Sequence, residues 1–177
     1  MKLWRGLSLA ALLILAPAAS PRAEAALGDF FGQYTGYGFA QDKSGPFINT
    51  PRGFELTIAP LAPDGFQIEW TTIKRKGTSP NDLDAEMSRS SASFLPAGGP
   101  GLYHAVGTAD PLAGGAMMWA RLAGDILCVY RMVVEADGVP ELHVYRRMWT
   151  AKGLELYFTS ARDGVVVRTV RGRYARQ

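Results

Sequence analysis

Residues 30–39 read Phe30-Phe31-Gly32-Gln33-Tyr34-Thr35-Gly36-Tyr37-Gly38-Phe39, an aromatic stretch whose glycines all occupy even positions. Side chains alternate between the two faces of a β-strand, so these glycines share one face. Glycine weakens a flat strand, but it suits a strand that bends sharply or lets another backbone approach closely. The stretch therefore predicts a curled first strand of the kind that closes a β-barrel, with Tyr34 beside the space that the glycines leave.

The rest of the chain contains further strand-like segments separated by glycine turns. Residues 54–59 and 66–71 alternate apolar and polar side chains on either side of Asp64-Gly65, which predicts a hairpin. No segment has the helical pattern that a βαβ unit needs. We predict an all-β fold, an antiparallel up-and-down barrel of about 8–10 strands, with loops 40–53 and 74–84 at one end. The remaining predicted strands are 30–39, 85–95, 102–106, 116–122, 125–135, 139–150, 154–161 and 165–174.

The first 25 residues have the pattern of a secretory signal peptide. Lys2 and Arg5 precede an apolar run over 6–16, and Ala23-Glu24-Ala25 is a small-residue cleavage site. We predict a cut after Ala25, a periplasmic or secreted location, and a single barrel domain over 26–177. Lipoprotein attachment is not expected, because the only cysteine, Cys128, lies far from the apolar run. No later segment has the roughly 20 apolar residues of a transmembrane helix.

Charge and cysteine content narrow the possible partners. Lys2, Arg5 and Arg22 leave with the signal peptide together with Glu24, which reduces the formal charge from +3 to +1. A nucleic-acid-binding domain has a stronger basic bias, so we predict no nucleic-acid partner. A single cysteine allows no intramolecular disulfide, and stability must come from the hydrophobic core.

Residues 126–134 carry apolar side chains on both faces of the predicted strand. The residues of the two faces must therefore be compared to predict which face points into the barrel. One face holds Ile126, Cys128, Tyr130, Met132 and Val134, and the other holds Leu127, Val129, Arg131 and Val133. We predict that the first set, like Met117, points into the barrel. In the next strand Arg146 shares a face with Leu142, Val144 and Met148. Burying an arginine alone is costly, so Arg146 is expected at the barrel rim, against a partner, or in solvent behind a bulge.

The pair formed by Gly32-Gln33-Tyr34 and an arginine near the carboxyl terminus resembles a motif of the calycin superfamily, which includes the lipocalins. In that superfamily a G-x-W on the first strand packs against an arginine on the last strand. Here Tyr34 replaces the tryptophan, and the carboxy-terminal helix of lipocalins has no counterpart. The resemblance implies a lipocalin-like barrel closed by Gly32, Tyr34, Arg168 and Arg171, with Tyr34 stacked on Arg168 or Arg171.

Nearly all of the chain after residue 25 is also similar to an uncharacterised family of small exported bacterial proteins, which implies no function. The shared motifs are Phe31-x-x-Tyr34-x-Gly36-x-Gly38, Gly65-Phe66-x-Ile68-x-Trp70-Thr71, Trp119-Ala120-Arg121-x-x-Gly124-Asp125-x-Leu127-x-Val129-Tyr130, Tyr145-x-Arg147, Gly153-Leu154-x-Leu156-x-Phe158 and Arg168-x-Val170-x-Gly172.

Catalytic motifs are absent from the sequence. The two histidines, His104 and His143, lie among mostly apolar and aromatic residues without the ligand spacing of a metal site. Either one becomes a candidate general base only if Glu141 or Asp110 is close in space. Cys128 is expected to be a buried, inert thiol, and no serine lies in a nucleophile elbow. We predict no catalytic residue, metal or cofactor, and favour a protein that is not an enzyme.

The leading hypothesis is a periplasmic barrel that binds a small apolar or amphipathic ligand in its interior, with aromatic walls and an arginine that orients the polar end. Two alternatives stay open. One is a cell-envelope interaction module with a filled barrel, and the other is a barrel-type cyclase or hydrolase. The predicted ligand-binding residues are Tyr34, Trp70, Trp119, Arg121, Tyr130, Arg146 and Trp149.

Overall fold

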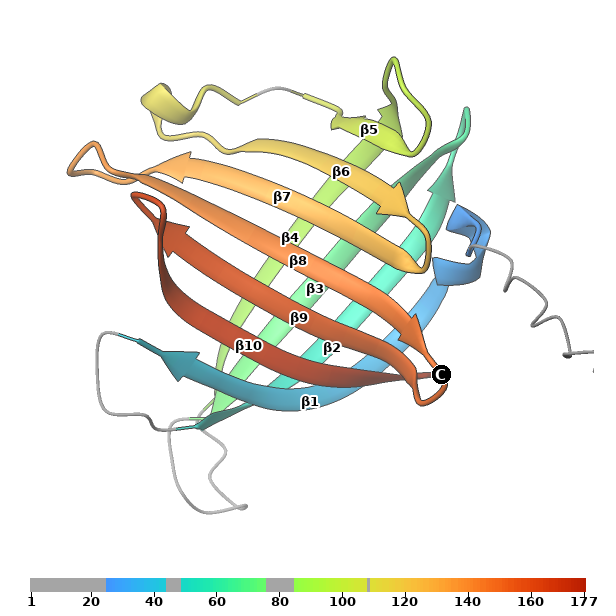
Figure 1. The fold of residues 1–177 in the computed structure, drawn as a ribbon, viewed down its shortest axis with the longest axis horizontal. Coiled ribbons are helices and arrows are strands. Elements are labelled where there is room, and N and C mark those ends of the chain that lie inside the picture. Colours follow the sequence, from blue (N-terminus) through green and yellow to red (C-terminus); the bar gives the residue numbers. More distant parts are fainter. Residues whose placement is uncertain (1–24, 44–48, 76–84, 108) are drawn as a thin grey trace, which may run out of the picture.

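A computed structural model describes residues 25–43, 49–75, 85–107 and 109–177. The predicted signal peptide, apart from Ala25, lies outside these residues, as do parts of both predicted loops. The described chain forms ten strands and two short 3-10 helices, η1 (Leu27–Phe30) and η2 (Pro111–Ala113) (Figure 1). The strands are β1 (Gly32–Asp42), β2 (Thr50–Leu61), β3 (Gly65–Arg75), β4 (Ala85–Pro96), β5 (Leu102–Ala105), β6 (Met117–Ala123), β7 (Ile126–Val134), β8 (Pro140–Thr150), β9 (Gly153–Arg162) and β10 (Val165–Arg176).

Every strand pairs antiparallel with its neighbours along the chain, and β1 also pairs with β10. The sheet is therefore a closed barrel, which confirms the predicted all-β, up-and-down fold. Its tight turns lie at the predicted positions, at glycine-containing pairs such as Asp64-Gly65 and Asp163-Gly164. Asp64 and Asp163 adopt positive φ values of 52° and 49° in two of these turns, a conformation that aspartate tolerates better than most residues.

The hydrophobic core fills the end of the barrel nearest η1. Phe66 and Phe94 are fully buried and stack with ring centroids 4.9 Å apart, and Tyr103 meets Phe66 edge-on at 5.3 Å. Phe30, the last residue of η1, is also fully buried and lies 6.1 Å from the ring of Trp149. This end of the interior is packed with side chains.

The glycines of β1 allow the first and last strands to approach closely. A Cβ atom on Gly38 would lie 2.1 Å from the carbonyl oxygen of Arg171 and 2.6 Å from the Cα of Gly172. A Cβ atom on Gly36 would lie 2.4 Å from the carbonyl oxygen of Arg173. Gly36 and Gly38 are thus required by the β1–β10 seam, whereas Gly32 lies before the seam and faces only the Arg176 side chain.

Tyr34 closes this seam with a different arginine from the two that were predicted. Arg176 lies over the Tyr34 ring at 5.5 Å, whereas Arg168 pairs with Asp42 and Arg171 lies over Tyr157 on the outside of the barrel. The Tyr34–Arg168 or Tyr34–Arg171 stack was therefore wrong. The reason is the register, which places Tyr34 opposite Arg176. The Tyr34 hydroxyl also donates a 2.9 Å hydrogen bond to the Phe30 carbonyl.

The facing of β7 and β8 is also the reverse of the prediction. Leu127 and Val129 are fully buried in the core, opposite Arg147 and Tyr145 of β8. The set Ile126, Cys128, Tyr130, Met132 and Val134 therefore lies on the outer face, as does Met117, which is 46% exposed. Cys128 is nevertheless covered by its neighbours, so the prediction of a buried thiol is confirmed. Arg146 points outward too, toward Tyr157, which is one of the three positions expected for it, but the register of β8 contains no bulge. The prediction failed because the outer face of these strands is itself apolar, which removes the contrast between inside and outside.

Candidate functional site

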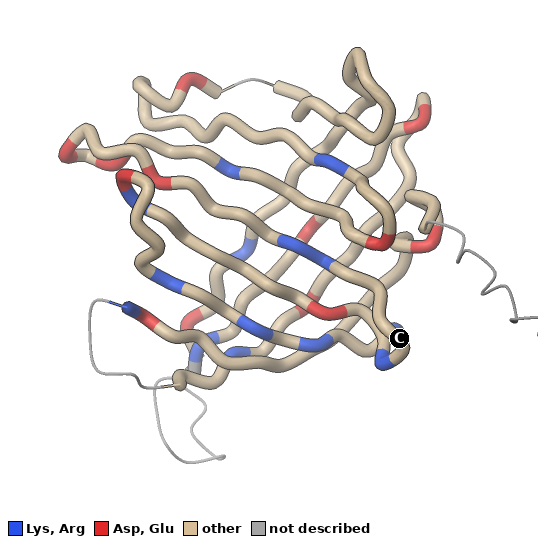
Figure 2. The backbone as a smooth tube through the Cα atoms, viewed as in Figure 1, with Lys and Arg blue, Asp and Glu red and all other residues tan. Residues whose placement is uncertain are grey.

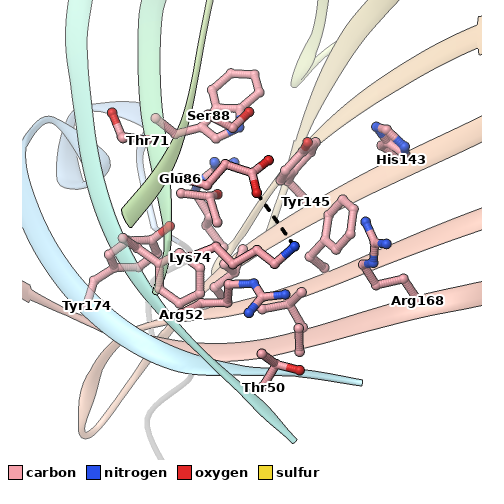
Figure 3. A pocket seen from close by; sticks show the side chains of 18 of the residues that line it. Thr50, Arg52, Thr71, Lys74, Glu86, Ser88, His143, Tyr145, Arg168 and Tyr174 are labelled. Atoms are coloured by element: carbon pink, nitrogen blue, oxygen red, sulfur yellow. Dashed lines mark ion pairs between the residues drawn. The ribbon is translucent and has the colours of Figure 1, made fainter. Parts of the chain in front are cut away.

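The end of the barrel opposite η1 holds an internal cavity of about 590 Å³ (Figure 3). Its walls come from β1–β4 and β8–β10. The antiparallel order explains this placement, because the polar ends of these strands meet at one rim. The lining side chains are those of Ala40, Asp42, Thr50, Arg52, Phe54, Trp70, Thr71, Thr72, Lys74, Glu86, Ser88, His143, Tyr145, Arg147, Leu156, Phe158, Arg168, Val170 and Tyr174.

Arg147, in the middle of β8, is the unusual residue of this lining. Its side chain is completely buried, and its Nε and Nη1 atoms have no hydrogen-bond partner. The guanidinium carbon lies 5.7 Å from the Trp70 ring and 5.5 Å from the Tyr145 ring. Burial lowers the pKa of Arg147, and the nearby phenol of Tyr174 opposes this shift. An arginine stays protonated in proteins, so the cavity wall contains a buried positive charge.

The walls beside Arg147 are mainly apolar and aromatic. Phe54, Leu156, Phe158 and Val170 are each at most 8% exposed. The Tyr145 ring lies 4.7 Å from that of Phe158. Such walls suit an apolar ligand body, and the volume falls in the range of small-molecule pockets.

The rim of the cavity is charged, and most of its charges are paired. Arg168 contacts Asp42 at 2.5 Å, and Lys74 lies 3.6 Å from Glu86 (Figure 3). Arg52 donates a 2.9 Å hydrogen bond to the Pro51 carbonyl, and its pKa is lowered by burial and by the charge of Arg168. The described acids of the lining, Asp42 and Glu86, are thus engaged at the rim and leave Arg147 without a carboxylate partner.

A second polar group lies on β8 and β9. The Ser160 hydroxyl donates a 2.5 Å hydrogen bond to Glu141, whose carboxylate also lies 2.8 Å from His143 Nε2. Arg131 approaches His143 Nδ1 at 3.3 Å. The hydrogen bond from Ser160 and the contact with His143 lower the pKa of Glu141 against its burial. The serine is directed at the carboxylate and not at the imidazole, so the group lacks the order of a nucleophile, base and orienting acid.

The predicted ligand-binding residues do not come together in one place. Trp70 lines the cavity, whereas Tyr34 and Trp149 lie in the filled end, where their rings are 6.4 Å apart. The other four are on the outer surface, where Trp119 stacks on Tyr130 at 4.9 Å and Arg121 is exposed. Only Trp70 of this set borders the cavity. The outer four are Trp119, Arg121, Tyr130 and Arg146.

Arg147 was not among the predicted site residues, although the sequence contains a signal for it. β9 alternates cleanly, with Leu154, Leu156 and Phe158 on one face. Counting back across the tight turn at Lys152-Gly153 places Arg147 opposite Leu156. An arginine opposite a clearly inward leucine is predicted to point inward.

Comparisons with known proteins do not assign the chain to a family. No protein-family model matches the chain, and no curated protein or solved structure is similar to it. The closed ten-stranded barrel is compatible with a calycin-like fold. In the part of the chain that the structure describes, no helix has the length and apolar character needed to cross a membrane.

Proposed function

We propose that this chain is an exported barrel protein that binds a small amphipathic anion in its interior. The observation that carries the proposal is Arg147, which is fully buried against a cavity without a carboxylate partner. An ion taken out of water costs several kcal/mol unless a counter-charge offsets the cost. A carboxylate, sulfate or phosphate group on a ligand would supply that counter-charge.

The aromatic rings beside Arg147 offset only part of the cost. Each desolvated cation–π contact contributes up to about 2 kcal/mol, and the rings of Trp70 and Tyr145 make two such contacts. Neither ring accepts the hydrogen bonds that Nε and Nη1 can donate. Both atoms are buried behind the cavity wall, so a bound oxyanion would accept these hydrogen bonds after a neighbouring side chain moves aside, and hydrogen bonds to a charged group contribute about 1.5–3 kcal/mol each.

The shape and lining of the cavity favour a ligand with an apolar body. Phe54, Phe158, Leu156 and Val170 provide apolar walls between Arg147 and the charged rim. A ligand would therefore place its anionic group at Arg147 and its apolar body along these walls. This orientation differs from the predicted one, in which an arginine at the mouth held the polar end.

Export is supported by the sequence of the first 25 residues, with Lys2 and Arg5 ahead of an apolar run and a small-residue cleavage site. Cell fractionation of a producing bacterium, with mass determination of the recovered chain, tests this part. A chain that begins at Ala26 in the periplasm or medium supports export, and a full-length chain in the cytoplasm contradicts it.

The filled-barrel alternative describes only the end of the interior nearest η1, because the opposite end holds the 590 Å³ cavity. Glu141 lies close to His143, which is the condition set for a general base, but the Ser160–Glu141–His143 group lacks the order of a nucleophile, base and orienting acid, so it does not favour a hydrolase. Interior binding is therefore the function that we propose.

The experiment compares an anion with an uncharged molecule of the same length. Isothermal titration with dodecanoate and with dodecanol measures the affinity of each for the wild-type protein. We expect dodecanoate to bind more tightly, and Arg147→Met to weaken its binding by about 10- to 150-fold, the equivalent of one charged hydrogen bond. Arg146→Met is the matched control, because this neighbour points outward. Equal affinity for both molecules, or equal losses in both variants, would overturn the proposal.

A further inference from the structure

The outer surface of the barrel has two unlike sides. The outward residues of β2–β4 are mostly polar and include Glu55, Gln67 and Ser91. Large exposed apolar side chains also occur elsewhere, as Met87 of β4 does at 68%, but a group of four lies close together on β1, β8 and β9. Tyr37 is 70% exposed, Phe39 50%, Met148 39% and Tyr157 36%. Exposed apolar side chains gathered on one side of a protein indicate an interaction surface.

On this apolar side, arginines alternate with aromatic residues and a cysteine along a row that runs at right angles to the strands. The registers place Phe39, Arg171, Tyr157, Arg146, Cys128 and Arg121 beside one another on β1, β10, β9, β8, β7 and β6. Neighbouring strands lie about 4.8 Å apart, so the arginines recur about every 10 Å. Figure 2 shows basic segments on β6, β8 and β10 on this side of the barrel. We call the row and its neighbours Tyr37, Ile126, Met148 and Arg173 the arginine–aromatic face.

Three arginines of this face lack an acidic partner among the described residues. Arg173 lies 3.5 Å from Glu155, but Arg121, Arg146 and Arg171 have no ion pair within the described ranges. Arg146 and Arg171 both lean on Tyr157, with their guanidinium carbons 5.9 Å and 5.4 Å from its ring centre. Two guanidinium groups thus flank one exposed ring, and each can donate hydrogen bonds to the oxygens of a phosphodiester.

A surface groove of about 540 Å³ lies at the centre of this face. Its lining combines Arg146, Arg171 and the Arg173–Glu155 ion pair with apolar side chains from four strands. The side chains of the groove that belong to the face are those of Tyr37, Phe39, Ile126, Arg146, Met148, Tyr157, Arg171 and Arg173. The groove therefore offers cationic and apolar contacts within one concave site.

We propose that the arginine–aromatic face docks onto an anionic lipid bilayer surface. Unpaired arginines match lipid phosphates, which they can bind through paired hydrogen bonds, and tyrosine is enriched where membranes meet water. The barrel is closed, so a partner strand has no free edge on which to pair. A second copy of the chain is disfavoured, since facing copies would bring Arg146 and Arg171 against like charges.

Vesicle sedimentation tests this proposal with a chain that begins at Ala26, which retains all ten strands and lacks the apolar run of residues 6–16 that would itself bind lipid. We expect binding to vesicles of phosphatidylcholine mixed with phosphatidylglycerol, little binding to phosphatidylcholine alone, and release at high salt. Arg146→Gln combined with Arg171→Gln should weaken binding about 30-fold, given the contribution of one basic residue near an anionic surface.

The matched control is Arg89→Gln combined with Arg162→Gln, which removes the same charge from residues that pair with Glu69 and Asp137 away from the face. Tyr37→Ser combined with Phe39→Ser tests the apolar contribution and should also weaken binding. Circular dichroism confirms that each variant folds. Equal losses in the control pair, binding that ignores lipid charge, or binding to polyglutamate without binding to vesicles would overturn the proposal. The last result would assign the face to an acidic protein partner.

Discussion

Replacing Arg147 with methionine should stabilise the ligand-free barrel. Methionine is unbranched and apolar, so it occupies much of the same space without a charge to desolvate. The residue is fully buried, and its Nε and Nη1 atoms have no hydrogen-bond partner. The wild-type protein therefore bears a cost in its folded state that the variant avoids.

The expected size follows from two opposing contributions. Desolvation of a guanidinium without a carboxylate partner costs several kcal/mol. The contacts with Trp70 and Tyr145 return about 2 kcal/mol each, and the phenol of Tyr174 also favours the charged form. We expect the free energy of unfolding to rise by about 1–3 kcal/mol. For a chain of this size each kcal/mol raises Tm by about 2–4 °C.

Thermal unfolding followed by circular dichroism measures this change. Bound small molecules must be removed first, because a ligand would stabilise the wild-type protein by mass action. Arg146→Met is the control, since Arg146 is adjacent in sequence and faces outward; its Tm should change little. A fall of several degrees in the Arg147→Met variant alone would refute the reasoning and make Arg147 a structural cation held by its aromatic neighbours.

Two further predictions concern the seam and the acidic network. Gly38→Ala should lower the free energy of unfolding by about 1–3 kcal/mol, because the new Cβ would lie 2.1 Å from the Arg171 carbonyl oxygen; chemical denaturation measures the loss. The pKa of Glu141 lies below its ordinary value of 4.5, so its ionisation contributes stability above that pH, and this contribution is lost as the pH falls through the folded-state pKa. Ser160→Ala removes the largest cause of the shift, which brings the folded-state pKa closer to the unfolded-state value, so the fall of Tm on acidification should become smaller.

Each of these two predictions has a control or an outcome that would contradict it. Gly28→Ala should be neutral, because a Cβ on Gly28 would meet no atom within 4 Å, and a loss equal to that of Gly38→Ala would show that the seam is not responsible. For the acidic network, an unchanged pH profile in Ser160→Ala would show that its hydroxyl does not hold Glu141 ionised.

The sequence predicted the strands and their order because both depend on local patterns. Glycine turns such as Asp64-Gly65 and Asp163-Gly164 separate alternating segments, and antiparallel hairpins follow from short connections. The glycines of residues 30–39 predicted the close β1–β10 approach for the same reason, since only a missing side chain permits it.

The residues of the candidate site depend on which face of each strand points inward and on how the strands align with one another. Local sequence patterns predict these two properties less well than they predict the strands themselves. β7 and β8 carry apolar side chains on both faces, so alternation did not separate the interior from the arginine–aromatic face. Arg146 was therefore included among the ligand-binding residues, whereas its neighbour Arg147 is the arginine that lines the cavity. The partner of Tyr34 was also missed, because the seam register depends on pairing between strands at opposite ends of the chain.

The pairing of β1 with β10 also sets the order of events as the chain is made. The hairpins from β2 to β9 join strands that are neighbours in sequence, whereas the seam joins the first strand to the last. Contacts between distant segments form late, because the entropy of bringing them together must be overcome first. Until Val165–Arg176 emerges, β1 and β9 present open edges that other chains can pair with. A chaperone that shields these edges would therefore act before β10 is complete, and truncation ahead of Val165 would leave a chain prone to edge-to-edge aggregation.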